Sequence, residues 1–135
     1  MNLAKLKREL TPLKKFGEVV IFGSQVTGDA TQRSDVDVAV VTHSRDREKN
    51  KDTWLDILGR VNPAEYDVKV FELLPLNVQM SVVNNFTVIY GNRLDLLEYF
   101  YFYRKLWSDV EHRYEENRFK SVKEKKKNWQ RLKKG

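Results

Sequence analysis

The sequence contains no cysteine and only two histidines, His43 and His112. The missing cysteines exclude disulfide bonds, thiolate zinc sites and cysteine nucleophiles, and two histidines argue against a histidine-based zinc centre. No run of about 18 apolar residues is present, so we expect no membrane-spanning helix, and residues 1–10 lack the apolar centre of a secretory signal. These absences lead us to expect a cytoplasmic location.

Proline and glycine are absent between Gly91 and Gly135. This absence favours one long helix beginning near Arg93. Five consecutive aromatic residues, at positions 99–103, surround the predicted helix, so a single face cannot bury all of them.

The first half of this C-terminal helix should therefore have two kinds of surface. We expect Leu94, Leu97, Tyr101 and one neighbouring stripe of side chains to pack on the domain. The other stripe is expected to be exposed or to contact a partner, either another protein or a second copy of the chain, through residues 93–115. Stacking on RNA bases is less favoured, because stacking aromatics usually lie on sheets or in grooves.

Acidic residues are scarce at the C-terminus. Residues 118–135 hold nine of the 25 lysines and arginines but a single acidic residue, Glu124. The rest of the chain has slightly more acidic than basic groups, so the formal net charge of +6 comes from this tail. Such a density of like charge predicts a solvated, partly disordered end, which would attract RNA or an acidic partner.

The most informative pattern lies in the first third of the chain. Two short β-branched runs, residues 19–22 and 38–41, are typical of strands. Gly23 ends the first run, and Asp35 and Asp37 precede the second. Because alternate residues of a strand share a face, both carboxylates point to one side. A short connection should place them beside Gly23, at one edge of an antiparallel pair.

These residue types suit Mg2+ and a triphosphate. Magnesium binds oxygen ligands, and two carboxylates on one face can share two ions that hold the attacking and leaving oxygens of an in-line displacement. Gly23 lets the backbone approach a phosphate because it has no side chain. Ser24 offers a hydroxyl, and the N–H groups after it would open a short helix whose positive end favours anions. We therefore predict Asp35 and Asp37 as metal ligands, and Gly23 with Ser24 as a phosphate seat.

The motif resembles a known signature. Gly23 and Ser24, ten further residues and then Asp35-Val36-Asp37 are similar to the pattern of the DNA polymerase beta type of nucleotidyltransferases, and of the minimal single-domain members in particular. The likeness covers residues 15–92. It implies transfer of a nucleoside monophosphate, AMP in the first instance, from a nucleoside triphosphate to a hydroxyl, with Ser34 in the nucleotide-binding stretch steadying the turn.

The remaining elements complete an α+β fold. The predicted helices cover residues 2–15, Asp46 or Asp52 to 61, and 75–84. The further strands are expected at residues 66–72 and 86–90. The middle helix should bury Trp54, Leu55, Leu58 and Val61. We expect a small mixed sheet with helices against its valine-rich face, a nucleotidyltransferase domain over residues 1–92, and a C-terminal helix and tail over residues 93–135.

A third carboxylate is expected on the strand that begins near Tyr66. A strand–helix–strand connection favours a parallel pair with a right-handed crossover, which places Asp67 beside the Asp35 strand. The resemblance implies that Asp67 is a metal ligand and helps the attacking hydroxyl to lose its proton. Glu65 and Glu72 are rivals, but Glu65 precedes the strand and Glu72 has the opposite phase; Asp67 could instead simply pair with Lys69.

The resemblance also carries an implication about partners. Minimal nucleotidyltransferases are commonly paired with a small helical HEPN-type protein as antitoxin and toxin, and some adenylylate a tyrosine of that partner. Two other interpretations stay open: a non-catalytic module that binds nucleotide or RNA with the same fold, and the catalytic half of a drug-modifying nucleotidyltransferase. Loss of a carboxylate would indicate the first, and a domain that recognises a small acceptor would indicate the second.

Overall fold

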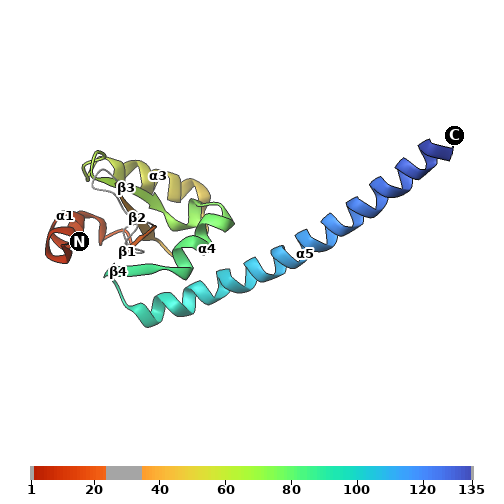
Figure 1. Cartoon of the computed structure of the whole chain (residues 1–135). Helices are drawn as coiled ribbons and strands as arrows, with labels where there is room; N and C mark the ends of the chain where they lie inside the picture. Colours follow the sequence, from red (N-terminus) through yellow and green to blue (C-terminus); the bar gives the residue numbers. More distant parts are fainter. Residues whose placement is uncertain (1, 24–34, 135) are drawn as a thin grey trace.

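The computed structural model describes the backbone of residues 2–23 and 35–134, and the side chains of these residues as far as 113 (Figure 1). The described helices are α1 (Leu3–Leu10), α3 (Arg47–Leu58), α4 (Leu76–Asn84) and α5 (Arg93–Lys134). Two 3-10 turns are η1 (Thr11–Leu13) and η2 (Phe71–Leu73). The described strands are β1 (Glu18–Phe22), β2 (Val36–Val41), β3 (Tyr66–Val70) and β4 (Phe86–Tyr90). None of the helices in this part of the chain is long and apolar enough to cross a membrane.

The described strands form one mixed sheet in the order β3-β2-β1-β4. Strand β1 is antiparallel to both β2 and β4, whereas β2 and β3 are parallel. The parallel pair is joined through α3, as the crossover argument predicted. The structure thus confirms the α+β class and the mixed sheet.

Helices cover both faces of the sheet, which the sequence argument anticipated for one face only. The valine-rich face, with Val38 and Val40 of β2, packs with Leu6 of α1 and Ile57 of α3. The opposite face carries Ala39 and packs with residues of α4 and α5. Alternate residues of a strand point to the same face, so Asp37, two positions before Ala39 on β2, also lies on this second face.

Helix α3 begins at Arg47, directly after Asp46, whose carboxylate caps the helix by accepting from the Lys49 N–H at 3.1 Å. It ends at Leu58 rather than at residue 61. The expected inner face was partly wrong, because Leu55 is 64% exposed and Leu58 is 39% exposed. Ile57 fills the core in their place, whereas Trp54 and Val61 pack against this core as predicted and are partly buried.

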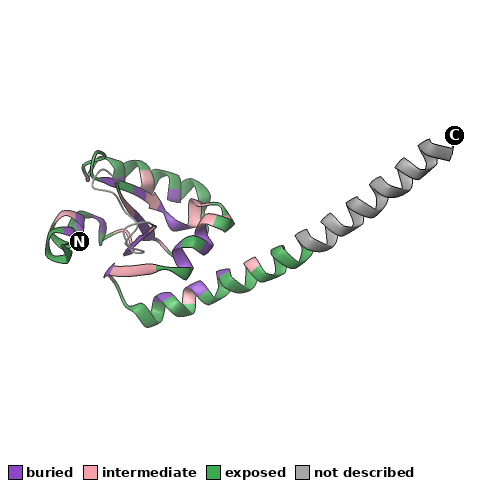
Figure 2. Cartoon of the chain, viewed as in Figure 1, coloured by how far each residue is buried: buried purple, intermediate pink, exposed green. Residues whose placement is uncertain are grey.

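Helix α5 begins at Arg93 as predicted, but the face assigned to the core was wrong. Leu94, Leu97 and Tyr101 are all exposed. The buried residues lie on a different stripe of the helix, whose ribbon is coloured by burial in Figure 2. They are Leu96, Phe100 and Tyr103, with Tyr99 and Trp107 packed against them. The backbone also continues as one helix to Lys134, where a partly disordered tail was expected.

Glu72 fixes α5 to the end of the sheet. The strand expected over residues 66–72 ends at Val70, and the 3-10 turn η2 follows it. Glu72 lies in this turn, and its side chain reaches the residues that follow β2. Its carboxylate accepts from the N–H groups of Thr42 and His43 at 3.1 and 2.8 Å, and from the Tyr99 hydroxyl at 2.7 Å. Glu72 is therefore structural, which removes it as a rival to Asp67.

Candidate functional site

The sheet brings three predicted site residues into one row. In the parallel pair, Asp37 lies directly opposite Asp67, and in the antiparallel pair Phe22 lies opposite Asp37. Gly23 follows Phe22, so the row runs from Asp67 on β3 through Asp37 on β2 to Gly23 at the end of β1. Asp35 lies two residues before Asp37 and is exposed.

Gly23 touches the carboxylate of Asp37. Its φ angle is +78°, and a β-carbon built on it would lie 2.5 Å from Oδ2 of Asp37. Only glycine combines this backbone conformation with so close an approach. Both residues belong to the motif found in the sequence, and the missing side chain of Gly23 leaves room for the Asp37 carboxylate.

Asp37 lies in an unfavourable electrostatic environment. Burial raises its pKa, and the negative charges of Asp67 and Asp35 raise it further, while Lys69 opposes them. Lys69 is a basic residue beside the row, with its Nζ 3.6 Å from Oδ1 of Asp67. The sequence argument had given Lys69 no role beyond pairing with Asp67, although alternation along β3 puts it on the same face.

The donor set fits magnesium bound together with a phosphate ligand. Among the described side chains, no three carboxylates or imidazoles converge as a preformed metal centre. Magnesium does not require one, because it usually binds through one or two carboxylates plus substrate phosphates. A cation placed near Asp37 would also offset the repulsion from Asp35 and Asp67.

The remaining residues considered for the site are Ser24, Ser34 and Glu65. Ser24 and Ser34 lie outside the described residues. Glu65 precedes β3, and its backbone carbonyl accepts the Val36 N–H at 3.0 Å. The roles assigned to Asp35, Asp37 and Asp67 stay predictions, although Asp37 and Asp67 are neighbours as expected.

A Gly23→Ala variant should test the contact with Asp37. The left-handed backbone costs an alanine about 1–2 kcal/mol, and the new methyl group would displace the Asp37 carboxylate. We expect the free energy of unfolding to fall by about that amount in urea titrations, and magnesium binding to weaken in calorimetry. Gly59→Ala is the matched control, because Gly59 has a right-handed φ of −82° and ordinary contacts. Equal effects of the two substitutions would contradict the special role of Gly23.

Comparison with known proteins identifies the family of the chain. A family model described as a nucleotidyltransferase domain matches residues 3–89. A protein of Methanocaldococcus jannaschii, provisionally named a protein adenylyltransferase, is 43% identical over 112 residues, which cover 83% of this chain and 85% of that protein.

Solved structures share the fold. A chain from a crystal structure of a toxin–antitoxin complex with AMP-PNP superposes with a TM-score of 0.61 over 82% of this chain and 90% of that chain, at 17% identity. A chain from the complex of tri-AMPylated Shewanella oneidensis HEPN toxin with MNT antitoxin gives a TM-score of 0.54 over 80% and 85%, at 14% identity. The family-model match and the 43% identical relative together establish that the chain belongs to the nucleotidyltransferase domain family and is a nucleotidyltransferase.

Proposed function

We propose that this nucleotidyltransferase moves AMP from ATP to a hydroxyl group of a partner protein, such as a tyrosine, and that it needs magnesium to do so. The observation that carries the proposal is the row Asp67, Asp37 and Gly23 across three strands. The name of the M. jannaschii relative, a provisional protein adenylyltransferase, supports AMP and a protein acceptor.

The reaction is an in-line displacement at the α-phosphorus. The acceptor oxygen forms a new bond to that phosphorus, and the bond from the phosphorus to the oxygen that bridges to the β-phosphate breaks. Pyrophosphate leaves with the electron pair of that bond. Asp67, on the acceptor side, helps the hydroxyl to lose its proton, while Gly23 and Ser24 seat the β- and γ-phosphates and Ser34 steadies the turn before Asp35.

Asp35, Asp37 and Asp67 are the residues that would hold the metal, as two Mg2+ ions. When bound, magnesium neutralises charge on the phosphates and helps to align them. The chain's own contribution is the fixed spacing of the carboxylates, which β2 and β3 set by their parallel register.

The proposed partner is a small helical protein of the HEPN type. The solved structures with this fold include HEPN toxin–MNT antitoxin complexes, one with an AMPylated toxin. Helix α5 supplies a suitable surface, because six large apolar side chains are exposed on its part up to residue 113. They are Leu94, Leu97, Tyr101, Phe102, Leu106 and Val110. A homodimer through the same surface is the alternative, and RNA would be restricted to the basic tail.

Labelling in the native cell extract tests the proposal. The full chain is incubated with ATP, GTP, CTP or UTP that carries radiolabel on the α-phosphate, with magnesium or with EDTA. We expect ATP to label a protein only in magnesium, with release of pyrophosphate. Label on a small molecule would point to a drug- or metabolite-modifying enzyme, and nucleotide binding without pyrophosphate release would point to a non-catalytic module.

A further inference from the structure

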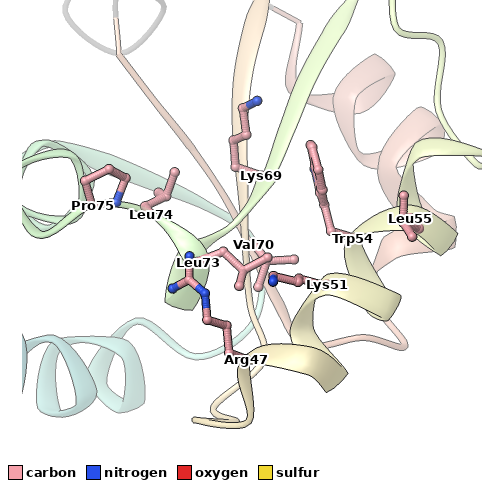
Figure 3. Close-up of a pocket in the computed structure, with 9 residues that line it drawn as sticks. All are labelled: Arg47, Lys51, Trp54, Leu55, Lys69, Val70, Leu73, Leu74 and Pro75. Carbon is pink, nitrogen blue, oxygen red and sulfur yellow. The ribbon is translucent and has the colours of Figure 1, made fainter.

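A pocket of about 580 Å³ opens at the β3 edge of the sheet, between α3 and the end of β3 (Figure 3). Helix α3 forms one wall, and the end of β3 with the chain from η2 toward α4 forms the other. Its size lies within the range of ligand sites, which is roughly 300–1,000 Å³.

The pocket combines an apolar lining with positive charge. The nine lining residues are Arg47, Lys51, Trp54, Leu55, Lys69, Val70, Leu73, Leu74 and Pro75. Three of them are basic and none is acidic. Arg47 has no ion-pair partner among the described residues, and Lys51 reaches only Glu48, whose side chain is 84% exposed. An exposed ion pair of this kind is weak, so Arg47 and Lys51 are available to a ligand.

Lys69 joins the pocket to the carboxylate row. Its side chain lines the pocket while its Nζ lies 3.6 Å from Oδ1 of Asp67. Gly23, the proposed phosphate seat, lies at the opposite end of the row, beyond Asp37. An in-line displacement needs the attacking oxygen on the side opposite the leaving pyrophosphate. The pocket is therefore on the acceptor side of the site.

We propose that this pocket binds the segment of the protein acceptor next to the modified hydroxyl, and that this segment carries acidic and apolar side chains. The inference rests on the proposed transfer to a protein. The acidic groups would pair with Arg47 and Lys51, and the apolar groups would fill the space over Leu55 and Leu74. Charge complementarity of this kind gives specificity and speeds encounter.

The nucleobase fits the pocket less well. The indole N–H of Trp54 already donates to the Val68 carbonyl at 2.8 Å. The Lys69 ammonium lies 5.3 Å from the centroid of the same ring. A base would have to displace this cation to stack there, whereas an acidic segment would retain it.

Two tyrosine peptides test the inference with the full chain. One places two glutamates before the tyrosine and two leucines after it, and the other replaces the glutamates by lysines. Each carries a dye for anisotropy, and AMP transfer from labelled ATP is measured in parallel. We expect the native chain to bind the acidic peptide about tenfold more tightly. Arg47→Glu with Lys51→Glu should reverse this preference, since charge reversal turns each attraction into repulsion.

The control is Lys49→Glu, an exposed change on the same helix that does not line the pocket. It should leave the preference unchanged, and no variant should alter the KM for ATP. An unchanged peptide preference in the double variant would overturn the inference, and a raised KM for ATP in that variant would reassign the pocket to the nucleotide. Binding of the acidic peptide without transfer to any protein would contradict the proposed function and leave the pocket assignment standing.

Discussion

Asp37→Asn is expected to abolish nucleotidyl transfer and, at the same time, to make the metal-free protein more stable to heat. Transfer should fall by at least about a hundredfold, because asparagine removes the charge that the proposal uses to hold magnesium. Stability should rise because burial and the charges of Asp67 and Asp35 disfavour the ionised carboxylate. Pyrophosphate release and thermal unfolding in EDTA measure the two effects.

The pH dependence of the stability gain follows from the raised pKa of Asp37. Between the ordinary pKa and the raised one, the native state binds more protons than the unfolded state, so the free energy of unfolding falls as pH rises through this window. The asparagine variant has no such loss. Its advantage should therefore be full above the folded-state pKa and disappear in acid below the ordinary value.

Asp52→Asn is the matched control, because Asp52 is exposed on α3 and is not among the charges that shift the pKa of Asp37. It should change neither transfer nor the melting temperature. Magnesium should raise the melting temperature of the native protein and of Asp52→Asn, but not that of Asp37→Asn. Near-native pyrophosphate release by Asp37→Asn would show that the metal assignment is wrong.

The carboxylate row was predictable because it depends on local rules. The β-branched runs define the strands, alternation along each strand puts Asp37 on one face, and the handedness of a strand–helix–strand connection brings Asp67 alongside. The close contact of Gly23 with Asp37 follows from the same register. None of these steps needs knowledge of how helices pack.

Helix faces and the pocket were not predictable in this way. Five aromatic residues in succession on α5 make every face of the helix similarly apolar, so the sequence does not show which face is buried. Phe100 is buried because its ring packs against the rings of Phe71 and Phe86. The pocket joins α3, β3 and the chain after η2, which are separated in sequence. Arg47 and Lys51 are four residues apart and do share a helix face, but their charge alone indicates only a solvated surface.

Replacing exposed apolar residues of α5 should separate the partner from the enzyme without disturbing the enzyme itself. The variant carries Tyr101→Ser, Leu106→Ser and Val110→Ser, at positions that are 62%, 40% and 39% exposed. If each contributes about 1 kcal/mol or more to binding, the complex should weaken by about a hundredfold or more. Size-exclusion chromatography with light scattering and recovery of the partner from native extract measure this loss.

Two comparisons make the α5 result specific. Glu98→Ser, Lys105→Ser and Asp109→Ser alter the same number of exposed positions on the same helix without removing apolar surface, and should leave the complex intact. Phe100→Ser, by contrast, removes a fully buried ring and should cost about 3–5 kcal/mol of folding stability. The apolar triple variant should keep the native melting temperature and Mg-ATP binding, because the domain does not bury these side chains.

If the native chain is monomeric, recovers no partner and still labels a small molecule, the protein-acceptor proposal fails and a metabolite- or drug-modifying enzyme takes its place.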